Sequence, residues 1–483
     1  MNNEINVIGE GTYGCVHKPS LHCKKNIKNF TYKNKVSKLL NNFNAKKELT
    51  EYSTIERVDK HNKFYTGKPL ICNPKKTYKS ENAIDQCENF KSSDIHKYSL
   101  LVMDDGGLNL YDYGKIVKKY KQTPENINKI EKFWIEAHRL LLGLRNFIRN
   151  DIIHHDLKPQ NIVYNEDKNR VNFIDFGLMT KISKSIRDAR NSIYNYDSWF
   201  SFPFEIEFIQ QDDYMRFAKL SIQEKENEYK KMLNRIKKPD YFKKIFFDYI
   251  SSDIDPSLKK ITIKNFFEDY FYTMINDIVP GGYDEFVKKC FKTFDIYGTG
   301  MALLYMLHKS LHLLETPLRD DMNELFTYMV TACVSSRYEI DEILEKYEDI
   351  LKRNNILKKH HLYFENHELK YGAFISHGLQ SKIDNSLIYF GDSSQSEKII
   401  ENISNKTPIK KCPDGKELNP QTKRCVNVCK PGYSRNDKFK CVKNKTVKKQ
   451  KNESNSKKSD KIWFTINSKS KSDTESDYYT ARQ

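Results

Sequence analysis

Four polar residues between Ile152 and Gly177 have the types and spacing needed for phosphoryl transfer. Asp156, Lys158 and Asn161 lie close together in one loop, and Asp175 follows shortly after it. Phosphoryl transfer needs a carboxylate that orients the attacking hydroxyl, a cation that neutralises the moving phosphate, and oxygen ligands for magnesium. These side chains supply each of those groups, so this stretch is the candidate catalytic centre.

Neighbouring apolar segments must hold these side chains in place. Residues 162–164 and 171–174 are predicted strands, the first directly after Asn161 and the second directly before Asp175. A helix with apolar periodicity is expected over residues 129–150, leading into the loop.

A glycine-rich segment near the start of the chain could cover a nucleotide. Its glycines lack the Cβ atoms that would hold the backbone away from phosphate oxygens. A dinucleotide-binding fold would require a long helix directly after such a segment, and the sequence does not predict one there. The segment is Ile8, Gly9, Glu10, Gly11, Thr12, Tyr13, Gly14, Cys15 and Val16.

A strand and a helix should follow, supplying a lysine and a glutamate. We choose Lys38 as the phosphate-binding lysine because Val36, two positions earlier, would share its face of a strand. The helical pattern over residues 45–58 presents Glu48 and Glu51, three positions apart. We expect Glu48 to pair with Lys38, with Glu51 as the alternative. Residues 59–97 are polar and irregular and are expected to form a long loop.

The charge and the apolar segments limit the environment of the chain. Lys and Arg number 82 against 64 Asp and Glu, a formal net charge of +18. The lysines are spread over every segment without an arginine-rich or aromatic-interleaved stripe, so no nucleic-acid partner is expected. No signal region opens the chain, and its most apolar stretch, 301–314, is too short to span a bilayer. We therefore expect an intracellular protein without a membrane partner, with reduced thiols except near the C-terminus.

Near the C-terminus the sequence contains a repeat with two cysteines in each unit. A zinc site normally shows closely paired cysteines, and only Cys425 and Cys429 approach that spacing, so a disulfide or thiol-tied module is favoured over zinc. Residues 443–483 are rich in Lys, Ser and Asn and are expected to be disordered. The four cysteines of the repeat are Cys412, Cys425, Cys429 and Cys441.

The order of these motifs resembles that of eukaryotic-type protein kinases. H-x-D-L-K-P-x-N occupies 154–161, D-F-G occupies 175–177, and P-F-E at 203–205 stands where kinases have A-P-E. D-x-[WY]-x-x-G at 295–300 matches the start of a core helix, expected to continue over 301–314. Lys158 within D-L-K-P-x-N is the serine/threonine form. The composition, a long insertion and the two-cysteine repeats look most like kinases of giant nucleocytoplasmic DNA viruses (mimivirus-like), whose repeats serve as adaptors.

The resemblance implies an α+β, bilobal protein kinase fold over residues 2–356. The small β-rich N-lobe would span 2–104 and the large helical C-lobe 105–356, with an insertion at about 207–292. After it would come a linker over 357–408, the adaptor-like repeats over 409–442, and the tail.

The resemblance also implies a role for each site residue. Asp156 would be the base, Lys158 would steady the γ-phosphate of ATP, and Lys38 would bind its α- and β-phosphates. Asn161 and Asp175 would hold Mg²⁺. Residues 8–16 would cover the nucleotide, with Met103 as gatekeeper at the end of a buried strand and Asp104 in the hinge beside the base.

Three further expectations concern the parts that hold the site together. Asp295 should accept hydrogen bonds from backbone N–H groups of the catalytic loop, and Arg337 could pair with Glu205. His155 replaces an arginine that binds a phosphorylated activation loop in many kinases. Activity should therefore not require that phosphorylation, and the segment should be held by packing, with the expected contacts made by Trp199, Phe200 and Phe202.

The function implied is an ATP-dependent protein serine/threonine kinase located in a host cytoplasm, in a viral factory or in a virion. The alternative is a pseudokinase scaffold that recruits protein partners through the cysteine repeats. Pseudokinases typically lose the lysine, the catalytic Asp or the D-F-G Asp, and here all three positions are filled.

Overall fold

A computed structural model describes residues 4–11, 14–195, 201–237 and 268–371, together with short strands near the C-terminus. The chain divides into two units, residues 1–401 and 402–483. Predictions for Thr12, Tyr13, Trp199 and Phe200 lie outside the described residues, as do those for the disordered tail and most of the linker.

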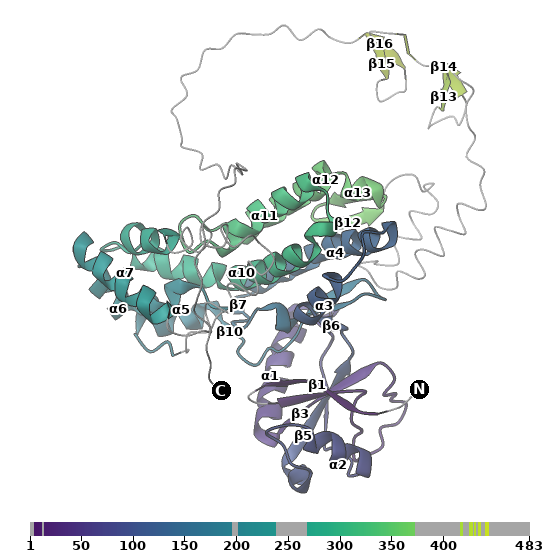
Figure 1. Ribbon diagram of the computed structural model, residues 1–483, viewed down its shortest axis with the longest axis vertical. Helices are drawn as coiled ribbons and strands as arrows, with labels where there is room; N and C mark the ends of the chain where they lie inside the picture. Colours follow the sequence, from purple (N-terminus) through teal and green to yellow (C-terminus); the bar gives the residue numbers. More distant parts are fainter. Residues whose placement is uncertain are drawn as a thin grey trace, which may run out of the picture. The chain divides into compact units, whose positions relative to one another are not determined.

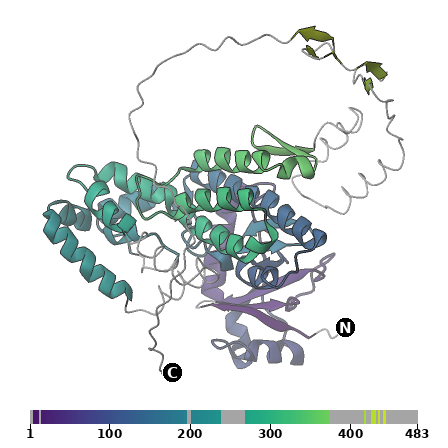
Figure 2. The same cartoon turned by 45° about the horizontal axis from the view of Figure 1, so that its top comes forward.

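An antiparallel five-stranded sheet forms the N-terminal part of the first unit (Figure 1). In spatial order its strands are β1 (Asn6–Gly11), β2 (Gly14–Lys18), β3 (Lys35–Asn41), β5 (Tyr98–Asp104) and β4 (Leu70–Cys72). Helix α1 (Asn42–Val58) follows β3 directly, because the Asn41 side chain caps its first turn by accepting from the Asn44 N–H. The helix runs alongside the sheet (Figures 1 and 2) and buries Tyr52 and Ile55.

The segment expected to be a long loop is structured, and this prediction was wrong. It contains β4, α2 (Tyr78–Asp85) and a 3₁₀ helix, η1 (Ser92–Lys97). Its apolar side chains, including Ala83, Ile84 and Phe90, pack with Leu39 and Leu100 of the sheet into a separate core. The apolar residues of this segment are few and scattered among polar ones, so no periodic pattern predicted this packing.

Two disulfides connect this segment to β2 and to the loop between β2 and β3, which corrects the expectation of reduced thiols. Cys15 is bonded to Cys87 and Cys23 to Cys72, with Cα–Cα distances of 6.2 and 5.7 Å. The partners are 72 and 49 residues apart in sequence, so no spacing rule could have paired them. Cys290 and Cys333 are free thiols.

Most of the remaining first unit is helical and shares one large core with short strands. The helix α4 (Pro124–Arg149) leads into the catalytic loop as expected, and α10 (Tyr283–Ser310) packs beside it. β8 (Ile162–Asn165) and β9 (Arg170–Phe173) pair antiparallel at the expected positions. The other elements are α3 (Leu110–Val117), α5 (Ile182–Arg190), α6 (Gln211–Ala218), α7 (Ile222–Lys237), α11 (Thr316–Val330), α12 (Ile340–Arg353), β6 (Leu108–Asn109), β7 (Ile152–Ile153), β10 (Thr180–Lys181), and the short helices η2 (Pro159–Asn161), η3 (Phe204–Phe208), η5 (Thr273–Asp277) and η6 (Leu311–Leu313).

Two predicted boundaries differ from the structure. The core helix begins at Tyr283, well before residue 301, because 283–300 supplies a continuous buried face that includes Phe286, Phe291 and Phe294. Residues 357–371, expected to begin a linker, belong to α13 (Ile356–Lys359) and to the hairpin of β11 (Leu362–Glu365) and β12 (Glu368–Tyr371). Leu357 and Leu369 of this segment are buried in the large core.

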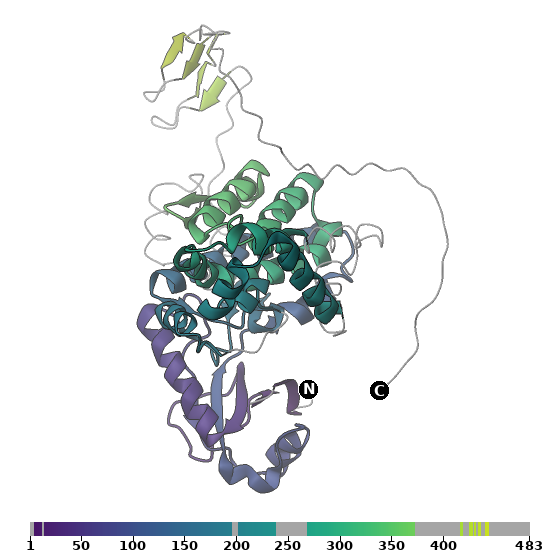
Figure 3. The same cartoon turned by 90° about the vertical axis from the view of Figure 1, so that its left-hand side faces the viewer.

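The described residues of the second unit form two antiparallel strand pairs, drawn in yellow-green in Figure 3. They are β13 (Lys416–Leu418) with β14 (Cys425–Asn427), and β15 (Tyr433–Arg435) with β16 (Cys441–Lys443). Cys429 is bonded to Cys441, whereas the pairing of Cys412 lies outside the described residues. Among the described helices, none combines the length and the apolar character needed to cross a bilayer.

Candidate active site

Lys38, Glu48 and Asp175 meet between the sheet and the helical part of the first unit. The ammonium group of Lys38 lies 2.9 Å from Glu48 Oε2 and 3.0 Å from Asp175 Oδ1. Three separate elements supply them: β3, α1 and the turn after β9. Helix α1 therefore presents Glu48, and not Glu51, to the lysine.

Neighbouring charges and burial shift the pKa values of this trio in opposite directions. Burial favours the neutral amine of Lys38, but the carboxylates of Asp175 and Glu48 outweigh it and raise the pKa of the lysine. Lys38 in turn lowers the pKa of Asp175 against the effect of burial. Glu51, beside the trio, has its pKa raised to about 7 by burial. The lysine is therefore a fixed cation that a polyphosphate could bind.

Asp156, Lys158 and Asn161 form a second cluster in the loop between β7 and β8. The Lys158 ammonium group lies 2.8 Å from both carboxylate oxygens of Asp156. Asn161 Nδ2 donates to Asp156 Oδ2 at 2.8 Å and to its backbone oxygen at 2.7 Å. These bonds fix the amide orientation, which leaves Asn161 Oδ1 as the atom able to ligate a cation.

Helix α10 packs against the catalytic loop and forms hydrogen bonds with it. The buried Asp295 carboxylate accepts the backbone N–H groups of His154 at 2.6 Å and His155 at 3.0 Å, as expected. One turn on, a Cβ at Gly298 would lie 2.3 Å from the Leu157 carbonyl oxygen, so only glycine lets the helix approach the loop this closely. His155 has φ of 68°, which these contacts maintain.

A neutral histidine connects the catalytic loop to the segment that follows D-F-G. His155 Nδ1 lies 3.2 Å from the Leu178 carbonyl oxygen, which can only accept, so Nδ1 carries the proton. Nε2 therefore accepts from the Tyr194 hydroxyl, 3.0 Å away. Burial lowers the pKa of His155 to about 3. Tyr194 gave no signal in the sequence that could have identified it.

Packing and an ion pair hold the end of the same segment. Phe202 packs edge-on against Phe294 with ring centroids 5.0 Å apart, as expected for Phe202. Arg337 and Glu205 are both fully buried and form the anticipated ion pair, with Nη2 and Oε2 3.0 Å apart.

The residues predicted to surround the nucleotide divide between the two faces of the sheet. Val16 is paired with Lys38 and Cys15 with Leu39, so Val16 shares the face of the lysine. Cys15 points into the opposite core, where it forms its disulfide. The Glu10 carboxylate likewise binds elsewhere, to the backbone N–H groups of Glu88 and Asn89.

At the far end of the site, Met103 and Asp104 end β5. Asp104 forms an ion pair with Lys35, and Met103 packs beside Leu101, which is paired with Lys38. The sequence did not identify Val163 as a site residue. A Cβ at Gly106 would lie only 2.5 Å from Cγ2 of Val163, so the Val163 side chain lies directly against the turn after β5.

The fold and this arrangement are those of a kinase-like domain. Residues 117–196, which include the catalytic loop and the D-F-G motif, match the family described as the ABC1 atypical kinase-like domain. A stretch of 72 residues is 36% identical to the serine/threonine-protein kinase prpf4B of Dictyostelium discoideum. The alignment covers 15% of this chain and 8% of that protein.

Proposed function

We propose that this chain is an ATP-dependent protein kinase that transfers the γ-phosphate of ATP to serine or threonine hydroxyls. The observation that carries the proposal is the meeting of two clusters: the Lys38–Glu48–Asp175 trio and the Asp156–Lys158–Asn161 loop. A scaffold without catalysis would not need both sets. The sheet and the helical part would then be two lobes, with the nucleotide between them.

Each residue would have a separate task in the transfer. Asp156 would accept the proton of the substrate hydroxyl, and Lys158, already bound to that carboxylate, would neutralise the γ-phosphate. Lys38 would bind the α- and β-phosphates while Glu48 fixes its position. Val163 and Met103 would contact the base.

The donor set fits a magnesium ion. A carboxylate of Asp175 and the free amide oxygen of Asn161 are hard oxygen ligands of the kind that Mg²⁺ prefers. When bound, the ion would neutralise charge on the phosphates.

The substrate class and location rest on the resemblance to viral kinases and on Lys158. A protein substrate with serine or threonine acceptors follows from the D-L-K-P-x-N form, and a host cytoplasm, viral factory or virion from the overall likeness. The cysteine repeats would recruit a protein partner.

The test is a phosphotransfer assay with purified full-length protein, radiolabelled ATP, magnesium and a generic basic protein. We expect label on serine and threonine after acid hydrolysis of the substrate, and none with Asp156→Asn. Nucleotide binding without any transfer would favour the pseudokinase, and label on a small molecule alone would exclude a protein substrate.

A further inference from the structure

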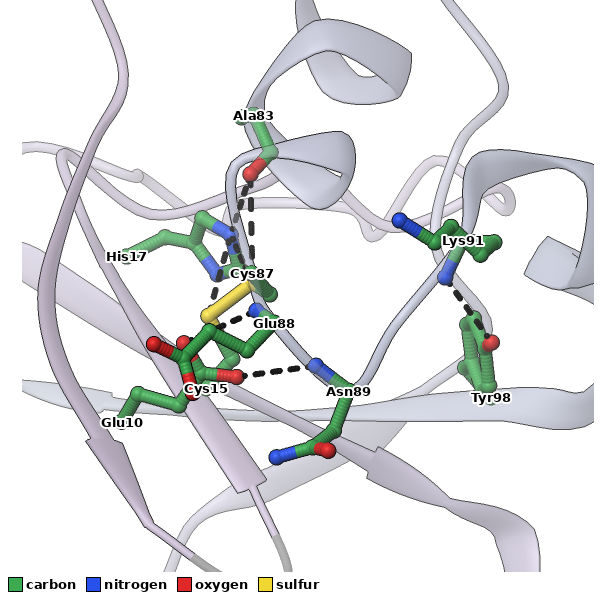
Figure 4. Close-up of a disulfide and its surroundings, with 9 residues drawn as sticks. All are labelled: Glu10, Cys15, His17, Ala83, Cys87, Glu88, Asn89, Lys91 and Tyr98. Carbon is green, nitrogen blue, oxygen red and sulfur yellow. Dashed lines mark hydrogen bonds between the residues drawn. A yellow bond between two sulfur atoms is a disulfide. The ribbon is translucent and has the colours of Figure 1, made fainter. Parts of the chain in front are cut away.

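Three side chains that could ligate a metal gather around one point (Figure 4). The register of β2 on β3 places them on the face of the sheet opposite Lys38. Cys15 and His17 are two positions apart on β2 and so share a face, and Cys87 follows α2. All three are buried, with exposures of 0%, 0% and 2%. Their ligand atoms lie within 4.8 Å of one another, so the fold has already brought together a potential set of ligands.

The distances from the imidazole to the two sulfurs are within or just above the range of a tetrahedral cation site. His17 Nε2 is 3.6 Å from Cys87 Sγ and 3.9 Å from Cys15 Sγ. Zn²⁺ holds thiolate sulfur at about 2.3 Å and imidazole nitrogen at about 2.0 Å, which places sulfur and nitrogen roughly 3.5–3.8 Å apart. The sulfurs are bonded to each other here, so the cation site would exist only after reduction.

We propose that the reduced chain binds Zn²⁺ through Cys15, His17 and Cys87. A dithiol reductant first opens the disulfide, leaving two thiols on the chain and becoming a cyclic disulfide itself. Zn²⁺ then displaces both thiol protons to solvent and binds the two thiolates, which balance its charge. His17 Nε2 exchanges its 3.1 Å contact with the Ala83 carbonyl oxygen for the metal. The fourth position is left for water or for a carboxylate such as that of Glu10.

The site would keep the Gly-rich strands in place where thiols stay reduced. The Glu10 carboxylate accepts the N–H groups of Glu88 at 3.0 Å and Asn89 at 3.1 Å, the two residues after Cys87. The disulfide and this carboxylate together fasten β1 and β2 to the segment after α2 (Figure 4). In a reducing compartment the disulfide would be lost, and the cation would make the same connection. The site does not depend on the proposed kinase activity.

The second disulfide provides a matched control. Among the described residues, no third His, Cys, Asp or Glu ligand atom lies within the same distance of both Cys23 and Cys72. Reduction of that pair should therefore create no comparable site.

The experiment uses the full-length chain, reduced with a phosphine and titrated with Zn²⁺ against a chromophoric chelator. We expect tight binding of about one equivalent with release of about two protons. Cys87→Ser and His17→Ala should lose this equivalent, and Cys72→Ser should retain it. The cysteines of the repeat are replaced by serine throughout, so that they do not bind the metal: Cys412, Cys425, Cys429 and Cys441.

Three results would overturn the proposal: no tight Zn²⁺ binding by the reduced parent, equal binding by Cys87→Ser, or equal binding by the unreduced parent. If a variant fails to fold, Co²⁺ bound to the reduced parent decides. A tetrahedral spectrum with thiolate-to-cobalt bands supports the site, and an octahedral spectrum without them refutes it.

Discussion

Replacing Tyr194 with phenylalanine should release the segment after D-F-G and lower the rate of phosphotransfer. The change removes the hydroxyl that donates to His155 Nε2 at 3.0 Å and leaves the rest of the ring. Tyr194 is 5% exposed and His155 is fully buried, so water cannot readily replace the lost donor. An unsatisfied buried group costs about 1–3 kcal/mol. The ratio of docked to released segment should therefore fall by roughly 5- to 150-fold.

The assay compares initial rates on an exogenous substrate for wild type and Tyr194→Phe, both treated with phosphatase. Dephosphorylated wild type should keep its full initial rate, because a neutral imidazole offers little to bind a phosphate. Two serines after D-F-G that could accept phosphate are poorly placed to do so: the Ser183 hydroxyl donates to Asp151, and Ser185 is only 1% exposed. The variant should lose kcat with little change in KM for ATP.

A second buried tyrosine provides a control that distinguishes a loss of segment docking from a general loss of protein stability. Tyr347 is also fully buried, and its hydroxyl donates to the Trp134 carbonyl oxygen within the helical core. Tyr347→Phe should lower the melting temperature without a matching loss of kcat. A lag in dephosphorylated wild type that disappears on rephosphorylation would refute the reasoning, as would equal rate losses in the two variants.

Four other predictions follow from the same contacts. Asp156→Asn should lower phosphotransfer by a few orders of magnitude and leave ATP binding nearly intact, since Asp156 addresses the hydroxyl; wild-type rates would disprove its role. Asp175→Ala should abolish magnesium-dependent ATP binding and activity together, and equal thermal stabilisation of wild type and variant by Mg-ATP would contradict this. Arg337→Ala leaves the Glu205 carboxylate buried and unpaired, and should cost about 3–5 kcal/mol in chemical denaturation, so a change under about 1 kcal/mol would argue against the pair. His155 has a pKa of about 3 when folded and about 6.5 when unfolded. Its contribution to stability is therefore complete above about pH 6.5 and is lost as pH falls, so between pH 7 and 5 wild type should lose stability more steeply than His155→Asn.

Local spacing was sufficient to predict much of the site. The loop from 154 to 161 is a short continuous stretch, so its residue order fixes which groups can meet, and Asp156, Lys158 and Asn161 do so. The alternation of a strand selected Lys38, and helix periodicity narrowed its partner to Glu48 or Glu51. These inferences depend on residues close together in the chain.

Only the tertiary structure could decide contacts between residues far apart in sequence. The pairing of Cys15 with Cys87 and the approach of Tyr194 to His155 depend on how whole segments pack. The orientation of Glu10 and Cys15 away from Lys38 follows from the registers of β1 on β2 and of β2 on β3, which a glycine-rich sequence leaves open. The start of α10 at Tyr283 depends on the helices and loop that bury its first turns. Sequence patterns indicate which residues should be buried, whereas the folded chain determines which partners bury them.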